Sequence, residues 1–280
     1  MVIFAIPLRS EGSANNWNVV LSHFHRTVRS IFNQTNPNFR CIVACTQKPV
    51  MDQEYDDRLE FIELPYAPVP TCWLEMARDK LWKLLMVAVR AREILEQQAD
   101  PENGIYVMPV DADDLVSRRI AEYCDRFPNE HGLVSKYGYV WQSDKRYFRT
   151  YKDMHTYCGS CEIIKMYRED LPERCPAAPE LCHDRDIAKW LNERYPIRFD
   201  HGIIVDHYAS IGRPFKKLPF CSTVYSLGTG DNMSAIHQAL YEHRSADKKR
   251  FHPIKFLRDM NLFSYMPICW YTKREFGFDG

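Results

Sequence analysis

The sequence predicts an α/β fold: an αβα sandwich with a mostly parallel central sheet and a small antiparallel segment. Apolar, strand-like runs alternate with helical patterns through the first third of the chain. These runs are continuously apolar, which is typical of parallel strands covered on both faces. The 280 residues, of which 45% are hydrophobic, suffice for the core of one large domain.

Four short apolar runs predict the strands of the central sheet. Turn-forming residues bound them, such as Pro7 after the first run and Asn-Pro-Asn at 36–38 before the second. The predicted strands are residues 2–8, 39–46, 58–64 and 105–110. A helical pattern after the first strand and another before the fourth supply the crossover connections that parallel strands need.

Two helices are predicted among these strands. The first begins near Trp17, because apolar residues recur at helical spacing from there to residue 32. The second spans about 73–98 and is apolar on more than one face, which indicates a well-buried helix.

The pattern changes after residue 114. The remaining predicted elements are a helix at 116–127 capped by Ser117 or Asp114, short aromatic antiparallel strands within 131–151, a helix at 184–195 and a strand at 197–208. We expect a main domain over 1–234 and a helical, aromatic extension over 235–280 packed on it. The C-terminal aromatic residues could alternatively form a homodimer interface or touch a membrane surface.

Composition excludes several classes of protein. Lys+Arg 37 balances Asp+Glu 37, which argues against a general nucleic-acid binder. No run approaches the roughly 18–20 apolar residues that cross a bilayer, so no transmembrane segment is expected. The apolar N-terminal run is too short for a secretory signal. These observations predict a soluble, cytoplasmic protein.

The cysteines leave a structural zinc site open as an alternative. Most of the ten cysteines lie inside apolar runs and are expected to be small buried hydrophobes. Cys158 and Cys161 have CxxC spacing, with Cys175, Cys182 and His183 further on, which could indicate structural zinc. The spacing of the second half is not that of a zinc knuckle.

An acidic turn, "VDADD", follows the fourth predicted strand. It places Asp111, Asp113 and Asp114 where open parallel sheets bind ligands, at the carboxyl ends of the strands. Carboxylate oxygens are hard ligands that suit Mg²⁺ or Mn²⁺. Asp111 and Asp113 share a side if the strand geometry persists, whereas Asp114 points away or caps the next helix. An ordinary Asp-rich capping turn is the alternative.

The ordered motifs resemble GT-A fold glycosyltransferases, which are Rossmann-like, and especially the inverting family-2-like enzymes. The resemblance rests on "FAIPLRS" at the first strand, "VDADD" as the DxD-type motif, "CGSCEII" near the donor sugar, and "CHDRDIAKWL" as the acidic pair that opens a helix. His183 stands where this family more often has Glu. "LGTGDNMS" (227–234) resembles a loop of rhamnosyltransferase-like members.

This resemblance implies a metal-dependent, inverting transferase of the hexosyltransferase type. It would move a sugar from a UDP, GDP or dTDP donor to a hydroxyl of a glycan acceptor, with Mn²⁺ or Mg²⁺ on the diphosphate. Asp113 is the expected metal ligand, with Asp114 a second. Asp184 is the expected catalytic base, ahead of Asp186, or else a helix cap. His207 could be a further metal ligand, in competition with Asn232, or a buried structural histidine.

The resemblance and the cationic start of the second helix also imply nucleotide-sugar contacts. The expected residues are Pro7, Leu8, Arg9, Arg78, Lys80, Asp111, Ala112, Gly159 and Ser160. The aromatic residues Tyr137, Tyr139, Trp141, Tyr147 and Tyr151 could form an acceptor-binding wall or simply pack. A nucleotidyltransferase, or a non-catalytic carbohydrate-binding protein on a degenerate GT-A fold, are the alternative functions.

Overall fold

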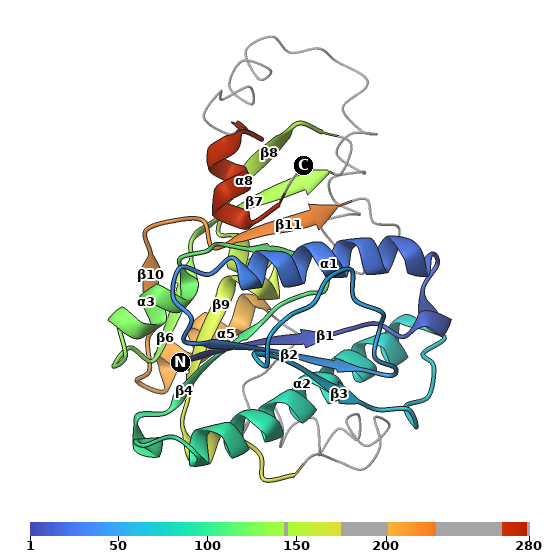
Figure 1. The fold of residues 1–280 in the computed structure, drawn as a ribbon. Coiled ribbons are helices and arrows are strands. Elements are labelled where there is room, and N and C mark those ends of the chain that lie inside the picture. Colours follow the sequence, from blue (N-terminus) through green and yellow to red (C-terminus); the bar gives the residue numbers. More distant parts are fainter. Residues whose placement is uncertain (143–144, 175–200, 228–264, 279–280) are drawn as a thin grey trace.

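The computed structural model describes residues 1–142, 145–174, 201–227 and 265–278. It contains a seven-stranded sheet with helices on both faces, and a second sheet of five strands beside it (Figure 1). The predicted α/β class, with a mostly parallel central sheet and a small antiparallel sheet, is therefore confirmed.

The large sheet has the strand order β10-β6-β9-β4-β1-β2-β3. Its strands are β1 (Val2–Pro7), β2 (Phe39–Cys45), β3 (Leu59–Glu63), β4 (Ile105–Pro109), β6 (Gly132–Ser135), β9 (Glu162–Met166) and β10 (Lys216–Leu218). The first four are the predicted strands, and they are parallel to one another. Strand β9 runs antiparallel between β4 and β6.

The strand order reverses at β1, which determines where a ligand can bind. From β1 the chain continues to β2 and β3 on one side, and β4 then pairs on the other side of β1. In open α/β sheets, such a reversal leaves a crevice at the carboxyl ends of the two central strands. The acidic turn follows β4, so it lies at this edge.

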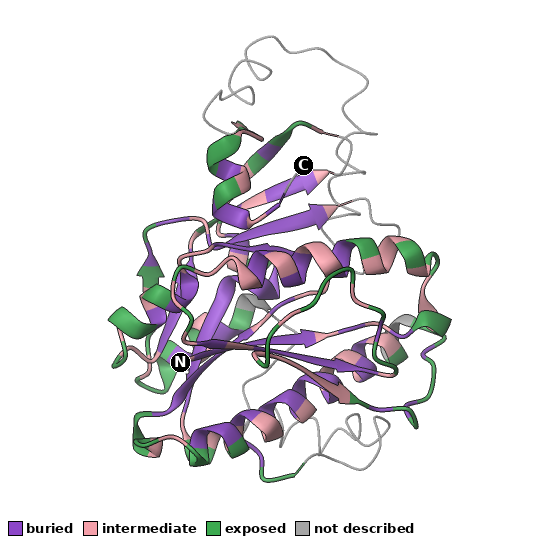
Figure 2. Ribbon diagram, viewed as in Figure 1, coloured by how far each residue is buried: buried purple, intermediate pink, exposed green. Residues whose placement is uncertain are grey.

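The two predicted helices cover opposite faces of the sheet (Figure 1). Alternate residues of β1 explain this arrangement: Ile3 and Ala5 share a core with α2 (Trp73–Glu96). Phe4 and Ile6 share the other core with α1 (Trp17–Phe32). Figure 2 shows the central strands almost wholly buried between these layers. Among the described residues, no helix combines the length and apolarity needed to cross a membrane.

The small sheet has the order β12-β8-β7-β11-β5. Its strands are β5 (Leu115–Val116), β7 (Tyr137–Gln142), β8 (Tyr147–Lys152), β11 (Thr223–Leu227) and β12 (Tyr265–Pro267). The predicted antiparallel pair within 131–151 is confirmed for β7 and β8. The first part of that segment instead forms β6 of the large sheet, one residue before β7, because it pairs with β9 and β10.

Two predicted elements differ from the structure. Residues 197–208 were expected to form a strand, but 201–210 form helix α5 (His201–Ser210), in which Ile204 and Tyr208 are buried four residues apart. The helix predicted at 116–127 is shorter, α3 (Ile120–Arg126), because the preceding residues pair as β5.

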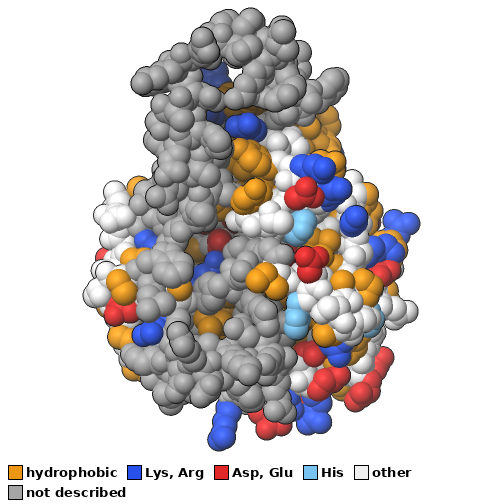
Figure 3. Space-filling view, turned by 180° about the vertical axis from the view of Figure 1, so that it is seen from behind, with side chains coloured by type: hydrophobic (Ala, Val, Ile, Leu, Met, Phe, Trp, Pro, Cys, Tyr) orange, Lys and Arg blue, Asp and Glu red, His pale blue; other side chains and the backbone are white. Residues whose placement is uncertain are grey.

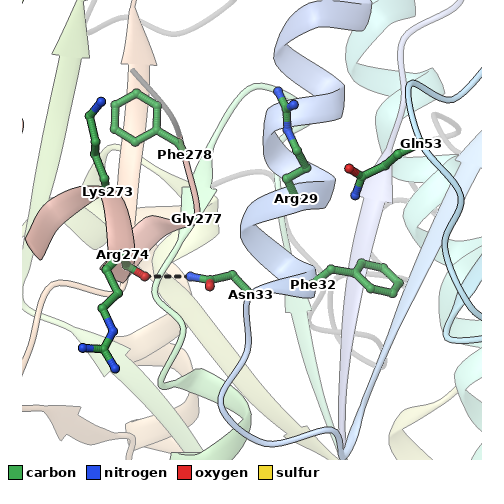
Figure 4. A pocket seen from close by; sticks show the side chains of 8 residues that line it. All are labelled: Arg29, Phe32, Asn33, Gln53, Lys273, Arg274, Gly277 and Phe278. Atoms are coloured by element: carbon green, nitrogen blue, oxygen red, sulfur yellow. Dashed lines mark hydrogen bonds between the residues drawn. The ribbon is translucent and has the colours of Figure 1, made fainter. Parts of the chain in front are cut away.

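The described C-terminal segment packs on the rest of the chain. Helix α8 (Trp270–Phe276) contributes Glu275, which accepts a hydrogen bond from Ser117 and pairs with Arg119 at 2.8 Å. The following Gly277 has φ +59 and lies against Asn33, where a Cβ atom would come within 2.7 Å of the Asn33 Cβ. A surface pocket of about 450 Å³ opens between α1 and this segment (Figure 4).

Short 3-10 helices complete the described elements. They are η1 (Glu11–Ser13), η2 (Pro101–Asn103), η3 (Met154–Thr156), η4 (Gly159–Cys161) and η5 (Arg168–Asp170).

Candidate active site at the strand ends

Five parts of the chain meet at the carboxyl ends of β1 and β4. Arg9 follows β1, and the acidic turn Asp111–Asp114 follows β4. The N-terminal half of α2 supplies Asp79, Lys80 and Lys83, whose bonds reach these two loops. The segment η4 and strand β11 complete the site through hydrogen bonds to the turn. The site therefore combines residues from distant parts of the sequence.

Asp114 is the internal anchor of the acidic turn. Its side chain is fully buried, and its Oδ2 accepts hydrogen bonds from Ser160 Oγ at 2.7 Å and Cys158 Sγ at 3.2 Å. Its Oδ1 accepts one from the backbone N–H of Ser226 at 3.1 Å. Burial, together with the charges of its neighbours, raises the pKa of Asp114 well above its usual value.

These bonds bear on both expectations for Asp114, as a helix cap and as a metal ligand. Asp114 does not cap α3, because the Asp114 carboxylate points into the protein. The N-cap residue of α3 is Arg119, which makes no side-chain cap bond. With no exposed surface and both oxygens bonded internally, Asp114 is also poorly suited to bind a metal ion in this arrangement.

Ser160, expected from the sequence to contact the donor, connects the acidic turn to η4. Its hydroxyl donates to Asp114 and accepts a hydrogen bond from the backbone N–H of Asp111 at 3.0 Å. The carbonyl of Ser160 in turn accepts a hydrogen bond from Thr223 of β11. Gly159 is buried beside it. Ser160 therefore fixes both ends of the turn.

Asp111 is held by a cation. Lys80 of α2 forms a short ion pair with its Oδ1, and both side chains are partly exposed. Burial lowers the pKa of Lys80, but the charge of Asp111 more than offsets this, so the pKa of Lys80 is raised. Lys80, expected from the sequence to contact the nucleotide sugar, thus lies in direct contact with the acidic turn.

Asp113 differs from the other two carboxylates. It is partly exposed, and within the described chain no other residue forms a hydrogen bond with its side chain. Burial raises the pKa of Asp113 to about 7, with the charge of Asp111 adding to this and Lys80 and Arg9 opposing it. Asp113 is therefore the carboxylate of the turn that is left available to an external partner.

A buried ion pair that the sequence reading missed supports the loop after β1. Lys83 is fully buried, donates to Asp79 Oδ2 at 2.5 Å and donates to the carbonyl of Leu8 at 2.8 Å. Burial raises the pKa of Asp79, and Lys83 opposes this rise. The i, i+4 spacing of Asp79 and Lys83 is the sequence signal that could have revealed the pair.

The other predicted nucleotide contacts lie around this frame. Arg9 donates to the sulfur of Met76 at 3.4 Å, and Pro7 is the last residue of β1. Arg78 of α2 is partly buried, and its Nε has no hydrogen-bond partner in the part of the chain that the structure describes. Ala112 contributes a carbonyl, which accepts a hydrogen bond from Thr27 of α1 at 3.0 Å.

The remaining expected residues are described only in part. His207 lies on α5 rather than on a late strand, half-buried and with its ring 6.0 Å from that of Tyr208. Across the described residues, no group of three or more His, Cys, Asp or Glu side chains could hold a metal ion. Asp184, Asp186 and Asn232 lie outside the described residues.

The zinc alternative is only partly described. Cys158 and Cys161 are buried free thiols, and burial raises the pKa of Cys158. Their proposed partners Cys175, Cys182 and His183 lie outside the described residues.

The fold and this site define a Rossmann-like α/β protein with an acidic turn at its topological switch point. No protein family matches the chain, and no curated protein matches it. Among solved structures, it is similar to a 2-C-methyl-D-erythritol 4-phosphate cytidylyltransferase from Francisella tularensis. The two share 12% sequence identity over 87% of this chain and 97% of that chain, with a TM-score of 0.32.

Proposed function

We propose that this protein is a metal-dependent, inverting glycosyltransferase that uses a nucleotide-diphosphate sugar as donor and a glycan hydroxyl as acceptor. The proposal rests on the different environments of the three carboxylates in the acidic turn. Asp114 is bonded internally, Asp111 is paired with Lys80, and Asp113 is partly exposed with no described partner. This carboxylate stands at the crevice where α/β sheets bind nucleotides.

The residues of the turn fit a divalent ion that is held mainly by its substrate. Mg²⁺ commonly binds one or two protein carboxylates together with substrate phosphates and water. Asp113 would supply the direct ligand, and Asp111 would bind the ion or a sugar hydroxyl. When bound, such an ion stabilises negative charge on a departing diphosphate.

Cationic side chains would complete the recognition of the diphosphate. Lys80 already balances Asp111 at the edge of the site, and the charge of Arg9 reaches Asp113. Arg78 lies on the same helix and has an unpartnered Nε. Fixed cations aimed at a leaving group stabilise the transition state without reorganisation. We assign these three side chains to the donor phosphates.

The transfer itself requires a base on the acceptor side. The acceptor oxygen would attack the anomeric carbon while the bond to the diphosphate oxygen breaks and its electron pair leaves with the nucleotide. The acceptor proton would pass to a carboxylate, for which we retain Asp184. Asp114 and Ser160 act as positioning residues, because they hold the turn in place.

Nucleotide binding tests this proposal directly. Calorimetric titration with UDP-, GDP-, dTDP- and CMP-sugars, with and without Mn²⁺, should reveal a donor whose binding requires metal. Asp113→Asn should abolish the metal-dependent part of the affinity, whereas Asp57→Asn, an exposed carboxylate elsewhere, should leave it unchanged. Metal-dependent binding that survives Asp113→Asn would refute the ligand assignment.

Product analysis separates this function from nucleotidyl transfer. A glycosyltransferase releases a nucleoside diphosphate from a nucleotide sugar. A nucleotidyltransferase instead joins a nucleoside triphosphate to a sugar phosphate, and pyrophosphate leaves the triphosphate. Asp184→Asn should stop glycosyl transfer while preserving donor binding. Pyrophosphate release without any sugar transfer would establish the alternative instead.

A further inference from the structure

The two faces of the small sheet carry different aromatic residues. The register of β7 and β8 places Tyr139 and Trp141 on the same face as Phe148. That face is covered by the C-terminal segment, including Phe276 and Phe278. Of the aromatic wall expected from the sequence, these members therefore pack inside the protein.

The opposite face presents tyrosine side chains to solvent. Tyr147 and Tyr151 of β8 lie on this face, and the pairing of Tyr265 with Arg149 adds Tyr265 of β12 to it. The exposed fractions of Tyr147 and Tyr265 are 39% and 40%, and their rings meet edge to face at 5.1 Å. Figure 3 views the molecule from the side away from α8, where orange side chains, a class that includes tyrosine, are exposed among Lys and Arg.

A fourth tyrosine joins this group. Burial raises the pKa of Tyr151, Arg149 opposes the rise, and Tyr265 and Tyr157 are near enough to add to it. Tyr157 is 49% exposed. We call Tyr147, Tyr151, Tyr157 and Tyr265 the tyrosine platform.

Arg149 supplies the platform with a cation. Strand alternation places Arg149 on the same face as Tyr147 and Tyr151, whereas Lys152 lies on the opposite face. Arg149 lies on the platform face, with its guanidinium carbon 5.1 Å from the centre of the Tyr151 ring. Among the described residues, no carboxylate pairs with Arg149. A guanidinium held in this way can bind a carboxylate through two parallel hydrogen bonds.

A buried cluster connects the platform to the candidate active site. Tyr157 directly precedes Cys158, whose thiol donates to Asp114 of the acidic turn at 3.2 Å. Cys158 and Cys161 also pack in one cluster with Tyr151 and Tyr225. The platform and the acidic turn therefore share a buried support.

We propose that the tyrosine platform binds an anionic saccharide chain, with Arg149 recognising a sugar carboxylate. A pyranose ring has an apolar C–H face, which suits the negative face of a tyrosine ring, and a rim of hydroxyl groups that suits the phenol oxygens. Tyr147, Tyr157 and Tyr265 are each at least 39% exposed, so more than one ring is available to contact sugar units. That this saccharide is the acceptor rests on the proposed glycosyltransferase function; the binding does not.

Calorimetric titration of the full chain with hexagalacturonate, and with the same oligomer after reduction of its carboxyl groups, tests the proposal. Arg149→Ala should weaken binding of the acidic oligomer by about tenfold, as expected when a charge-assisted hydrogen bond is lost. The same variant should bind the reduced oligomer as the wild type does. Tyr147→Ala and Tyr265→Ala should weaken binding of both oligomers by about fivefold.

Matched variants control for general effects. Arg146→Ala removes an exposed cation just before β8, and Tyr271→Ala removes a tyrosine of α8 that is 47% exposed. Neither should change either affinity. All variants alter exposed or partly exposed side chains, so thermal unfolding midpoints matching the wild type should accompany the titrations.

Three results would overturn the proposal. The first is that the wild type binds neither oligomer. The second is that the control variants lose as much affinity as the Arg149 and Tyr147 variants. The third is that the protein is a dimer that Tyr147→Ala and Tyr265→Ala dissociate. Equal affinity for the acidic and reduced oligomers would overturn the role of Arg149. The titrations contain no nucleotide or metal, so their failure is distinct from a failure of donor binding at Asp113.

Discussion

Replacing Asp114 with alanine should destabilise the protein, because its carboxylate anchors the acidic turn. The substitution leaves the buried N–H of Ser226 and the hydroxyl of Ser160 without their acceptor. An unsatisfied buried donor costs about 1–3 kcal/mol, and the hydroxyl can partly recover by rotating. We therefore expect a loss of about 3 kcal/mol in the free energy of unfolding, from roughly two stranded donors.

The companion substitution Asp113→Ala should not destabilise the protein. Asp113 forms no side-chain bond with another described residue, and its raised pKa shows that the folded protein disfavours its charge. Because alanine removes this charge, we expect the free energy of unfolding at pH 7 to stay level or rise. Donor binding, in contrast, should be lost in Asp113→Ala.

Thermal and urea unfolding of both variants measure this difference. A loss of about 3 kcal/mol lowers the midpoint by roughly 6–12 °C in a protein of this size class. Asp114→Ala should also weaken donor binding, because Ser160 positions the backbone of Asp111 as well. Equal destabilisation by the two variants, or a loss below about 1 kcal/mol for Asp114→Ala, would refute the division of roles in the turn.

Three further outcomes follow from buried groups. Lys83→Met should cost about 3–5 kcal/mol in urea unfolding by leaving Asp79 uncompensated, and the double variant with Asp79→Leu should regain most of it; no recovery would contradict the pairing. Burial lowers the pKa of His23 to about 4, so the unfolded chain binds its proton more tightly. The free energy of unfolding should therefore fall by up to about 3 kcal/mol as pH declines from about 6.5 to 4, and His23→Gln should flatten this slope relative to wild type. Gly277→Ala should lower the free energy of unfolding by about 1–3 kcal/mol, because Gly277 has a positive φ and an added Cβ atom would meet Asn33. The thermal midpoint should fall accordingly, and an unchanged midpoint would contradict the packing of Gly277 against Asn33.

The sequence predicted the central part of the fold well, because its signals there are local. The apolar runs that became β1 to β4 are short, bounded by turn residues and buried on both faces. The helix at 201–210 was missed because Ile203, Ile204 and Val205 read as a β-branched strand. Its helical signal is the burial of Ile204 and Tyr208 one turn apart, which depends on packing.

The position of the acidic turn was predictable, but the role of each carboxylate was not. Strand order places the turn at a ligand-binding edge, and that reasoning needs only the sequence. What separates Asp113 from Asp114 is the set of donors that surrounds each. The donors to Asp114 come from Cys158, Ser160 and Ser226, which lie 44, 46 and 112 residues further along the chain. No spacing rule within the turn encodes such partners.

This sequence separation also bears on the order in which the protein assembles. Strands β1 to β4 need only residues 2–109, so the parallel part of the sheet can form early, during synthesis. The acidic turn gains its last anchor only when β11 docks and presents the N–H of Ser226. Contacts between distant residues form late, because the intervening chain must first be ordered. Competence to bind a donor should therefore arise at the end of folding, and a nascent chain that stops short of β11 would have the sheet without the finished site.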